Sequence, residues 1–422
     1  MPNISSAFSG MTTNLRTLIG VDLRLLMRVG LCGMIMGWAN AVWASEQSHY
    51  EAVIDAGSSG SRLYLYRIID SQESYPIVQD VMSYEPRDLP GLSSFKGEPE
   101  RAVTEGVQPL LNALDAFLLR HHMASAAVQV SLIATGGMRS MGSAESALIL
   151  EAVKKAMQIR PYHVGRVEVI SGQMEAFYAW IDINVLAKRI NQTHLPSLGI
   201  VEIGGSSAQI AFEVSRDGPS VVDFSGGKVR RRVYSESFQG LGQNASRKRM
   251  IQFGSEREGW IDACFPKGLD REPLATDLPK EVTGQFNLSV CRGLYRRVLN
   301  EFSLQTLKTS EGRSTSFLAI GNGSPIGAID GALKVWNLSE RRLSGLADRA
   351  SGACSMPWKR VKRHFGGALS SPSQCANAVF IHTFLFDDDG LGLRYDQVRA
   401  QKRIQGREPT WTRGFLMAER GL

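Results

Sequence analysis

Residues 53–67 read Val-Ile-Asp-Ala-Gly-Ser-Ser-Gly-Ser-Arg-Leu-Tyr-Leu-Tyr-Arg, and this stretch decides the fold. Apolar residues lead to Asp55, a Gly/Ser turn follows, and apolar alternation resumes at Leu63, which predicts a strand, a tight turn and a second strand. Glycines at 57 and 60 let successive backbone N–H groups hold an anion. Because Asp55 would face that anion, a divalent cation is expected between them. An ordinary hairpin with a polar turn is the alternative interpretation.

The composition is that of a globular protein with more than one lobe. The 422 residues exceed the usual size of a single domain, and 43% hydrophobic residues can bury a core. The net charge of +7 is mild, and lysine and arginine are scattered along the chain. The charge therefore suits anionic substrates or an anionic surface and does not indicate a nucleic-acid partner.

Residues 1–44 have the pattern of a cleaved secretory signal. Arg16, Arg24 and Arg28 precede an apolar run from 29 to 43, and the expected cleavage point follows Ala44. A membrane anchor would need about 20 apolar residues, and no second apolar run follows. We therefore predict a secreted or periplasmic protein without a stable membrane anchor after cleavage.

The cysteines predict two disulfides. Of the 5 cysteines, Cys32 would leave with the signal, and an even number remains in an exported chain. Among three possible connectivities we expect the local one, Cys264–Cys291 with Cys354–Cys375, because it closes the smallest loops. Their spacing fits no zinc site.

Hydrophobic periodicity predicts strands and helices in alternation. Strands are expected over 50–81 as a meander, and over 128–134, 167–170, 198–203 and 210–214. Helices are expected over 98–119, from a capping Ser143 onward, and over 175–190. The segment 217–228 is expected to be a loop, and the aspartates at 387–389 a solvated surface turn rather than a calcium site.

Four strand-to-turn junctions carry the residues that are candidates for catalysis or binding. They read DAGSSGS at 55–61, ATGGMR at 134–139, SGQME at 171–175 and EIGGSSAQ at 202–209. The first and last share an acid, then Gly and Ser, then a second strand. Two such hairpins in two halves of the chain predict a duplicated lobe with two phosphate-binding loops that face each other.

The order of these motifs resembles the nucleoside triphosphate diphosphohydrolase (apyrase) family, within the actin-like ATPase superfold. The matching boxes are DAGSSGSR at 55–62, ATGGMR at 134–139, SGQMEAFYAW at 171–180 and VEIGGSSAQIAF at 201–212. The resemblance thins beyond residue 212. It implies an enzyme that removes terminal phosphates from nucleoside tri- and diphosphates such as ATP.

The resemblance also implies roles for single residues. Glu175 matches the catalytic base that orients the attacking water, and Ser207 and Gln209 match residues that hold that water. Thr135 and Gly136 match the turn that closes the site. Without the other three boxes, an acid in the first turn of a helix, favoured by the helix dipole, would be the preferred explanation of Glu175.

The remaining positions match phosphate and metal contacts. Asp55 and Glu202 match carboxylates that bind Mg²⁺ or Ca²⁺ through water. The phosphate-binding positions are Gly57, Ser58, Ser59, Gly60 and Ser61 in the first hairpin, and Gly204, Gly205 and Ser206 in the second.

The sequence departs from the family at three places. Glu202 replaces an aspartate, so its carboxylate reaches about one methylene further, and Met174 replaces an acid beside the base. The aromatic residues that stack on the nucleobase have no clear counterpart in 317–326. Tyr234, Phe238 and Trp336 are candidates for that role, although each is also typical of a core.

Two alternative functions compete with the apyrase interpretation. The exopolyphosphatase/guanosine pentaphosphate phosphohydrolase family has the same superfold, and Ser61-Arg62-Leu63 and Glu175-Ala176 resemble its motifs. Gln209, which stands where that family carries a glutamate, and the export signal argue against it. A non-hydrolysing nucleotide-binding module is the other, but a binder needs no water-orienting pair.

These observations predict an α/β fold of two RNase H-like (actin-like ATPase) lobes. Each lobe is expected to hold a mixed five-stranded sheet flanked by helices, with a cleft between the lobes. Lobe I would comprise 47–165 and 405–422, and lobe II 166–404 with both disulfides.

Overall fold

The computed structural model describes residues 48–70, 75–86, 89–226, 229–268, 283–304, 310–320, 336, 338, 343–365 and 373–421. Residues 48–422 form one compact unit. The predicted signal at 1–44 lies outside the described residues, as do 321–326 of the segment considered for nucleobase stacking. In the described part, no helix has the length and apolar character needed to cross a membrane.

The first sheet is mixed and five-stranded, as predicted. Its order is β3-β2-β1-β4-β5, with antiparallel pairing from β3 to β1 and parallel pairing from β1 to β5. The strands are β1 (Ser48–Ala56), β2 (Ser61–Ile69), β3 (Ile77–Tyr84), β4 (Val128–Ala134) and β5 (His163–Val169).

The second sheet has six strands in the order β11-β10-β6-β7-β9-β8, one more than predicted. They are β6 (Gly199–Ile203), β7 (Ser207–Val214), β8 (Val221–Gly226), β9 (Val229–Gln239), β10 (Phe317–Ile320) and β11 (Val398–Ala400). The segment 217–228 was predicted to be a loop, and this prediction is wrong. It contains β8, which pairs with β9.

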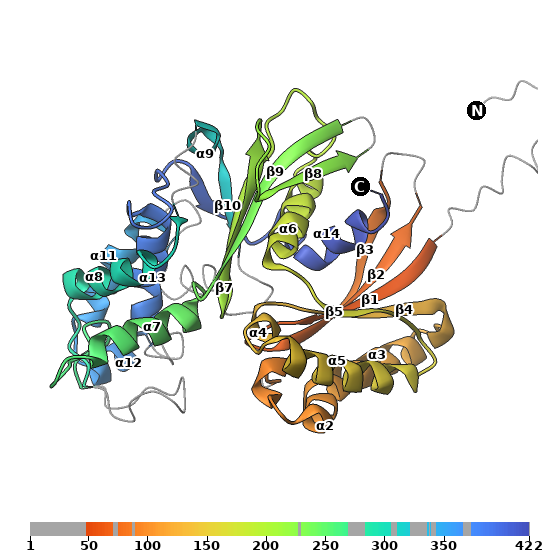
Figure 1. The fold of residues 1–422 in the computed structure, drawn as a ribbon, viewed down its shortest axis with the longest axis horizontal. Coiled ribbons are helices and arrows are strands. Elements are labelled where there is room, and N and C mark those ends of the chain that lie inside the picture. The colour runs from red at the N-terminus through yellow and green to blue at the C-terminus, as the bar shows by residue number, and fades with distance from the viewer. Residues whose placement is uncertain are drawn as a thin grey trace, which may run out of the picture. The chain divides into compact units, whose positions relative to one another are not determined.

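Helices lie on both faces of each sheet (Figure 1). On one face of the first sheet lie α2 (Pro99–Arg101), a π-helical stretch (Ala102–Val107), α3 (Gln108–Arg120) and α5 (Ser143–Gln158). Between the two sheets lie α6 (Gly172–Leu186) and α14 (Trp411–Ala418), whose core includes Tyr66 of the first sheet and Ile200 of the second. The mixed and layered α/β fold is therefore confirmed.

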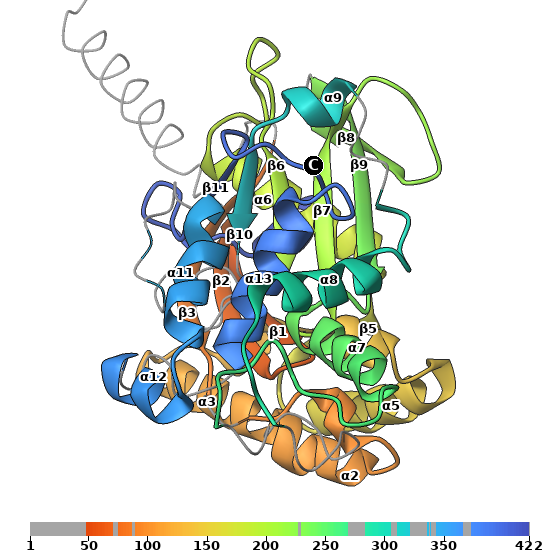
Figure 2. The same cartoon turned by 90° about the vertical axis from the view of Figure 1, so that its left-hand side faces the viewer.

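The outer face of the second sheet carries the remaining long helices (Figure 2). They are α7 (Gln243–Ser255), α8 (Leu288–Leu299), α11 (Leu346–Cys354), α12 (Trp358–Phe365) and α13 (Ser373–Phe386). The short α4 (Gly136–Arg139) and α9 (Ser310–Ser314) and 3₁₀ turns at Leu92–Phe95, Ser125–Ala127 and Leu343–Gly345 complete the described elements. Both predicted disulfides, Cys264–Cys291 and Cys354–Cys375, are present.

Three local predictions need correction. The third predicted helix begins at Gly172 rather than Glu175, because the Ser171 hydroxyl accepts a hydrogen bond from the Met174 N–H and caps it. Ser143 begins α5 but does not cap it, since the N-cap is Gly142. Asp387 is buried rather than solvated, and the Nε atoms of Arg292 and Arg296 each lie 2.7 Å from its Oδ2.

Candidate active site

The first hairpin joins β1 to β2 through a turn in which the Gly57 N–H donates to the Gly60 carbonyl (3.1 Å). A Cβ at Gly57 would lie 2.9 Å from that carbonyl oxygen, so the turn requires glycine there. Asp55 stands directly opposite Arg62 in the ladder, and the Arg62 Nη1 donates to the Asp55 Oδ2 (3.2 Å). The hairpin thus ends in a buried ion pair.

The second hairpin, between β6 and β7, repeats this geometry. The Gly204 N–H donates to the Ser207 carbonyl (2.9 Å), and Glu202 stands opposite Gln209. Both side chains are buried. The position that holds arginine in the first hairpin therefore holds an amide in the second.

The two turns approach each other closely. A Cβ at Gly205 would lie 2.8 Å from the Ser58 Oγ, and a Cβ at Gly137 would lie 2.8 Å from the Ser58 Cα. A Cβ at Gly136 would meet the Ser207 Oγ at 2.9 Å, so α4 lies against both turns. Only residues without a side chain permit backbones to pack this tightly.

Glu175 lies in the first turn of α6 with its carboxylate buried next to these turns. The Arg139 Nη2 donates to the Glu175 Oε2 (2.8 Å), and the Gln209 Nε2 lies 3.5 Å from the same oxygen. The Gln209 Nε2 also donates to the Ser207 Oγ (2.6 Å). The structure thus brings Glu175, Ser207 and Gln209 together.

Three buried carboxylates converge on this place, and burial raises the pKa of each. Burial raises the pKa of Asp55 to about 6, although Arg62 opposes the rise. The pKa of Glu175 rises by burial against the opposing effect of Arg139. The pKa of Glu202 rises well above its usual value through burial and then through the charges of Glu175 and Asp55. Such a group of acids favours a bound cation.

A model of the GDA1/CD39 (nucleoside phosphatase) family matches residues 41–420. The chain belongs to this family. It is accordingly a nucleoside phosphatase, an enzyme that hydrolyses phosphoanhydride bonds of nucleotides.

Several curated members of the nucleoside phosphatase family are similar to this chain. The nucleoside-triphosphatase ntp-1 of Caenorhabditis elegans is 28% identical over 87% of this chain and 72% of its own. Ectonucleoside triphosphate diphosphohydrolase 2 of Mus musculus is 26% identical over 93% of this chain and 87% of its own. Probable apyrase 4 of Arabidopsis thaliana is 28% identical over 83% and 75%.

Solved structures agree on the fold. A nucleoside triphosphate hydrolase structure from Neospora caninum superposes with a TM-score of 0.60 at 13% identity, covering 93% of this chain and 96% of that one. An Aquifex aeolicus member of the Ppx/GppA family reaches 0.50 at 14% identity, covering 88% and 98%. The actin-like ATPase superfold is therefore confirmed, while the family match separates this chain from the polyphosphatase alternative.

Enzymes of this nucleoside phosphatase family depend on a divalent cation, and the residues present fit one. The Asp55 Oδ1, Ser61 Oγ and Glu202 Oε2 are buried and have no hydrogen-bond partner. Unpartnered buried carboxylate oxygens are costly unless a cation or water satisfies them. Among the described residues no group of three His, Cys, Asp or Glu side chains lies close enough together to hold a metal ion by itself. Two carboxylates acting through water, with phosphate oxygens, suit Mg²⁺ or Ca²⁺.

The other predicted site residues lie on the same turns. The Thr135 N–H donates to the Ala56 carbonyl (3.2 Å), which joins the turn before α4 to the first hairpin. Ser59 is exposed at the tip of the first turn, and Ser206 is half-buried in the second. Their contact with phosphate stays a prediction.

Three contributing residues were missed by sequence reasoning. Arg62 and Arg139 are the last residues of two of the motifs, DAGSSGSR and ATGGMR, yet no role was assigned to either. A buried acid needs a cationic partner, and this requirement could have identified both arginines. Ser237, in β9, lies with its Oγ 3.1 Å from the Gln209 Nε2, and no local pattern marks it. Arg139 also donates to the Ser207 Oγ (3.3 Å) and the Ile170 carbonyl (3.1 Å).

The candidates for nucleobase stacking lie in the core of the second sheet. Tyr234, Phe238 and Trp336 are all buried there. Phe317 begins β10 and packs in the same cluster. None of these rings is free to accept a base in this structure.

Proposed function

We propose that this nucleoside phosphatase cleaves the terminal phosphate from both nucleoside triphosphates and diphosphates with Glu175 as the base. The observation that carries the proposal is the buried set of Glu175, Gln209 and Ser207 beside the two Gly/Ser turns. Hydrolysis of a phosphoanhydride requires an aligned water, a base to orient it and neutralised phosphate charge.

The chain's own residues divide this work. The backbone N–H groups of Ser58 to Gly60 in the first turn and of Gly205 and Ser206 in the second hold the two ends of the polyphosphate, since those of Gly57 and Gly204 close the turns themselves. Gln209 and Ser207 hold the water, and Glu175 takes a proton from it as its oxygen bonds to the terminal phosphorus. The bond from that phosphorus to the bridging oxygen breaks, and the oxygen leaves with the electron pair on the shortened nucleotide.

Two charged partners support these roles. Arg139 holds the carboxylate of Glu175 in place and favours its ionised form. Asp55 and Glu202 would hold Mg²⁺ or Ca²⁺ through water, and the ion when bound neutralises phosphate charge. We further propose that the mature protein acts outside the cytoplasm, which the two disulfides and the signal-like N-terminus support.

A substrate panel with metal titration tests the proposal. The purified chain is expected to release phosphate from ATP, ADP and GTP when Mg²⁺ or Ca²⁺ is present, and not after chelation. Release from long-chain polyphosphate alone would support the polyphosphatase alternative. Nucleotide binding without phosphate release would instead identify a binding module and contradict the proposal.

A further inference from the structure

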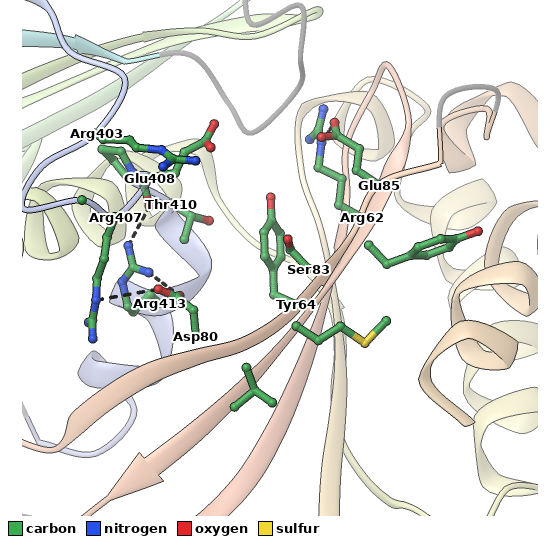
Figure 3. A pocket seen from close by; sticks show the side chains of 15 residues that line it. Arg62, Tyr64, Asp80, Ser83, Glu85, Arg403, Arg407, Glu408, Thr410 and Arg413 are labelled. Atoms are coloured by element: carbon green, nitrogen blue, oxygen red, sulfur yellow. Dashed lines mark hydrogen bonds and ion pairs between the residues drawn. The ribbon is translucent and has the colours of Figure 1, made fainter. Parts of the chain in front are cut away.

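A pocket of about 350 Å³ lies beside the first hairpin and contains none of the Gly/Ser turn residues (Figure 3). Strands β2 and β3 form one wall, and the segment from Arg403 to Arg413 forms the other. Arg62 and Glu85 lie on one side, Arg403 and Glu408 lie on the other, and the Tyr64 hydroxyl points into the space between them.

Three polar groups in this pocket are unused. Within the part of the chain that the structure describes, no hydrogen bond or ion pair engages the Arg403 guanidinium, the Glu408 carboxylate or the Tyr64 hydroxyl. Arg413 in the same wall is fully engaged, since its Nε donates to Asp182 (2.6 Å). A free cation, a free anion and a free hydroxyl suit a ligand that is anionic at one end and carries hydroxyl donors at the other.

The wall that carries Arg403 and Glu408 is preformed. Ile404 and Arg407 bridge each other through N–H to carbonyl hydrogen bonds of 2.8 and 3.0 Å, and Gly406 adopts a positive φ of 81° in the turn between them. Arg403 and Glu408 therefore flank a tight hairpin whose backbone is already ordered. A preformed wall reduces the entropy lost when a ligand binds.

We propose that this pocket is a second ligand site that binds a ribose 5-phosphate unit, carried by a nucleoside monophosphate or by a sugar phosphate. Arg403 pairs with the phosphate, and Glu408 accepts hydrogen bonds from the ribose hydroxyls, as carboxylates do in nucleotide sites. The Tyr64 hydroxyl completes the contacts from below. The volume lies within the usual range for small-molecule sites. That a nucleoside monophosphate is the natural occupant rests on the proposed function, which makes it the end product.

The pocket is connected to the active site through one side chain. The Arg62 Nε donates to the Glu85 Oε1 (2.6 Å) in the pocket wall, and its Nη1 donates to the Asp55 Oδ2 (3.2 Å). A phosphate bound in the pocket lies beside Arg62 and Glu85, which line it, so its charge acts on the guanidinium that holds Asp55. An occupied site is expected to change the Mg²⁺ concentration needed for half-maximal phosphate release.

Calorimetry tests the site directly. The full chain carrying Glu175→Gln is saturated with Mg²⁺ and a non-hydrolysable triphosphate analogue, so that the active site is filled, and is then titrated with AMP, ribose 5-phosphate or inorganic phosphate. AMP is expected to bind one further site. Arg403→Ala and Glu408→Gln are expected to weaken that binding roughly tenfold or more. Arg399→Ala, an exposed arginine of β11 outside the pocket, is the matched control and leaves binding unchanged.

Each outcome of the titration either supports or overturns the proposed second site. Equal affinity for AMP and ribose 5-phosphate supports the proposal and identifies the sugar phosphate as the recognised unit, and binding of AMP alone supports it for nucleotides. Absence of saturable binding, displacement by the analogue, or equal binding in Arg403→Ala and Arg399→Ala overturns it. Phosphate release by the wild-type chain is measured separately, so failure of the proposed function is distinguishable from failure of this site.

Discussion

The two Gly/Ser hairpins share a backbone design and differ in the residue that stands opposite the acid. In the first hairpin Asp55 faces Arg62, whose guanidinium binds it. In the second hairpin Glu202 faces Gln209, whose amide is directed to Ser207 and Glu175. The first hairpin thus holds its own carboxylate in place, whereas the second directs a hydrogen-bond donor at Glu175, the proposed base. One cross-strand position therefore distinguishes a hairpin that pairs its acid with a cationic side chain from one that presents an amide to Glu175.

The same difference appears in the electrostatics. Burial raises the pKa of Asp55 to about 6 against the opposing charge of Arg62. Glu202 has no direct cationic partner among the described side chains, and its pKa rises well above the usual value through burial and the nearby carboxylates. We infer that the second hairpin depends more strongly on a bound cation than the first.

The largest effect is expected when the first hairpin receives the residue that stands opposite the acid in the second. Arg62→Gln leaves Asp55 buried and unpaired, and should lower the free energy of unfolding by about 3 kcal/mol, measured by denaturant titration without metal. Arg67→Gln on the same strand, where the arginine donates to the Ser48 hydroxyl, is the control and should change it little. Equal stability of the two variants would contradict the anchoring role of Arg62.

A second variant tests Glu175, the proposed base, which lies beside the two hairpins. Glu175→Gln should lower kcat by a factor of about 10² or more while KM changes little, because the amide cannot accept the proton of water. Glu145→Gln provides a matched control, since Glu145 also occupies the first turn of a helix. If both variants kept full turnover, Glu175 would be only a helix-terminal acid.

The chemical role of the second hairpin is tested by Gln209→Ala. Loss of the amide that contacts Ser207 and Glu175 should lower kcat by roughly tenfold, and loss of its buried hydrogen bonds should lower the free energy of unfolding by about 1–3 kcal/mol. Steady-state kinetics and thermal unfolding are measured together. A variant that loses stability but not turnover would reverse the assignment of roles to the two hairpins.

The smallest expected effect is a pH dependence of stability without metal. The folded pKa of Asp55, about 6, lies above the unfolded value of about 3.9, so the contribution of Asp55 to stability is fully present below pH 4 and is lost as pH rises through 6. In EDTA the unfolding temperature should therefore drop by a few degrees between pH 4.5 and 7, and Mg²⁺ should restore it at pH 7. Asp55→Asn should reduce this drop, and an unchanged drop would assign it to other groups.

Sequence reasoning succeeded where the signal is local. The strand-turn-strand patterns at Asp55 and Glu202 became β1–β2 and β6–β7, because glycine and serine at fixed offsets determine a turn. Pairing cysteines over the shortest loops also agrees with both disulfides. It failed beyond residue 214, where the segment that contains β8 was expected to be a loop and β9, β10 and β11 were not predicted. Three residues of β11 (Val398–Ala400) carry no readable period, and β8 is stabilised by its pairing with β9.

Asp387 shows a further limit. A run of three aspartates predicts a solvated turn, yet Arg292 and Arg296 of α8 bury the first of them. Those arginines lie more than 90 residues away in the chain, so no window of sequence could pair them. Charge in a sequence indicates solvent only until a partner of opposite charge is folded against it.

By itself the sequence determined the two turns, their acids and the family to which the chain belongs, because short-range backbone chemistry specifies a tight turn. Only the tertiary structure decided which side chains meet, such as Arg139 with Glu175 and Ser237 with Gln209. The physical reason is that a contact between distant residues is set by the packing of whole sheets and helices. The number of residues between two positions in the sequence does not say whether their side chains will be in contact.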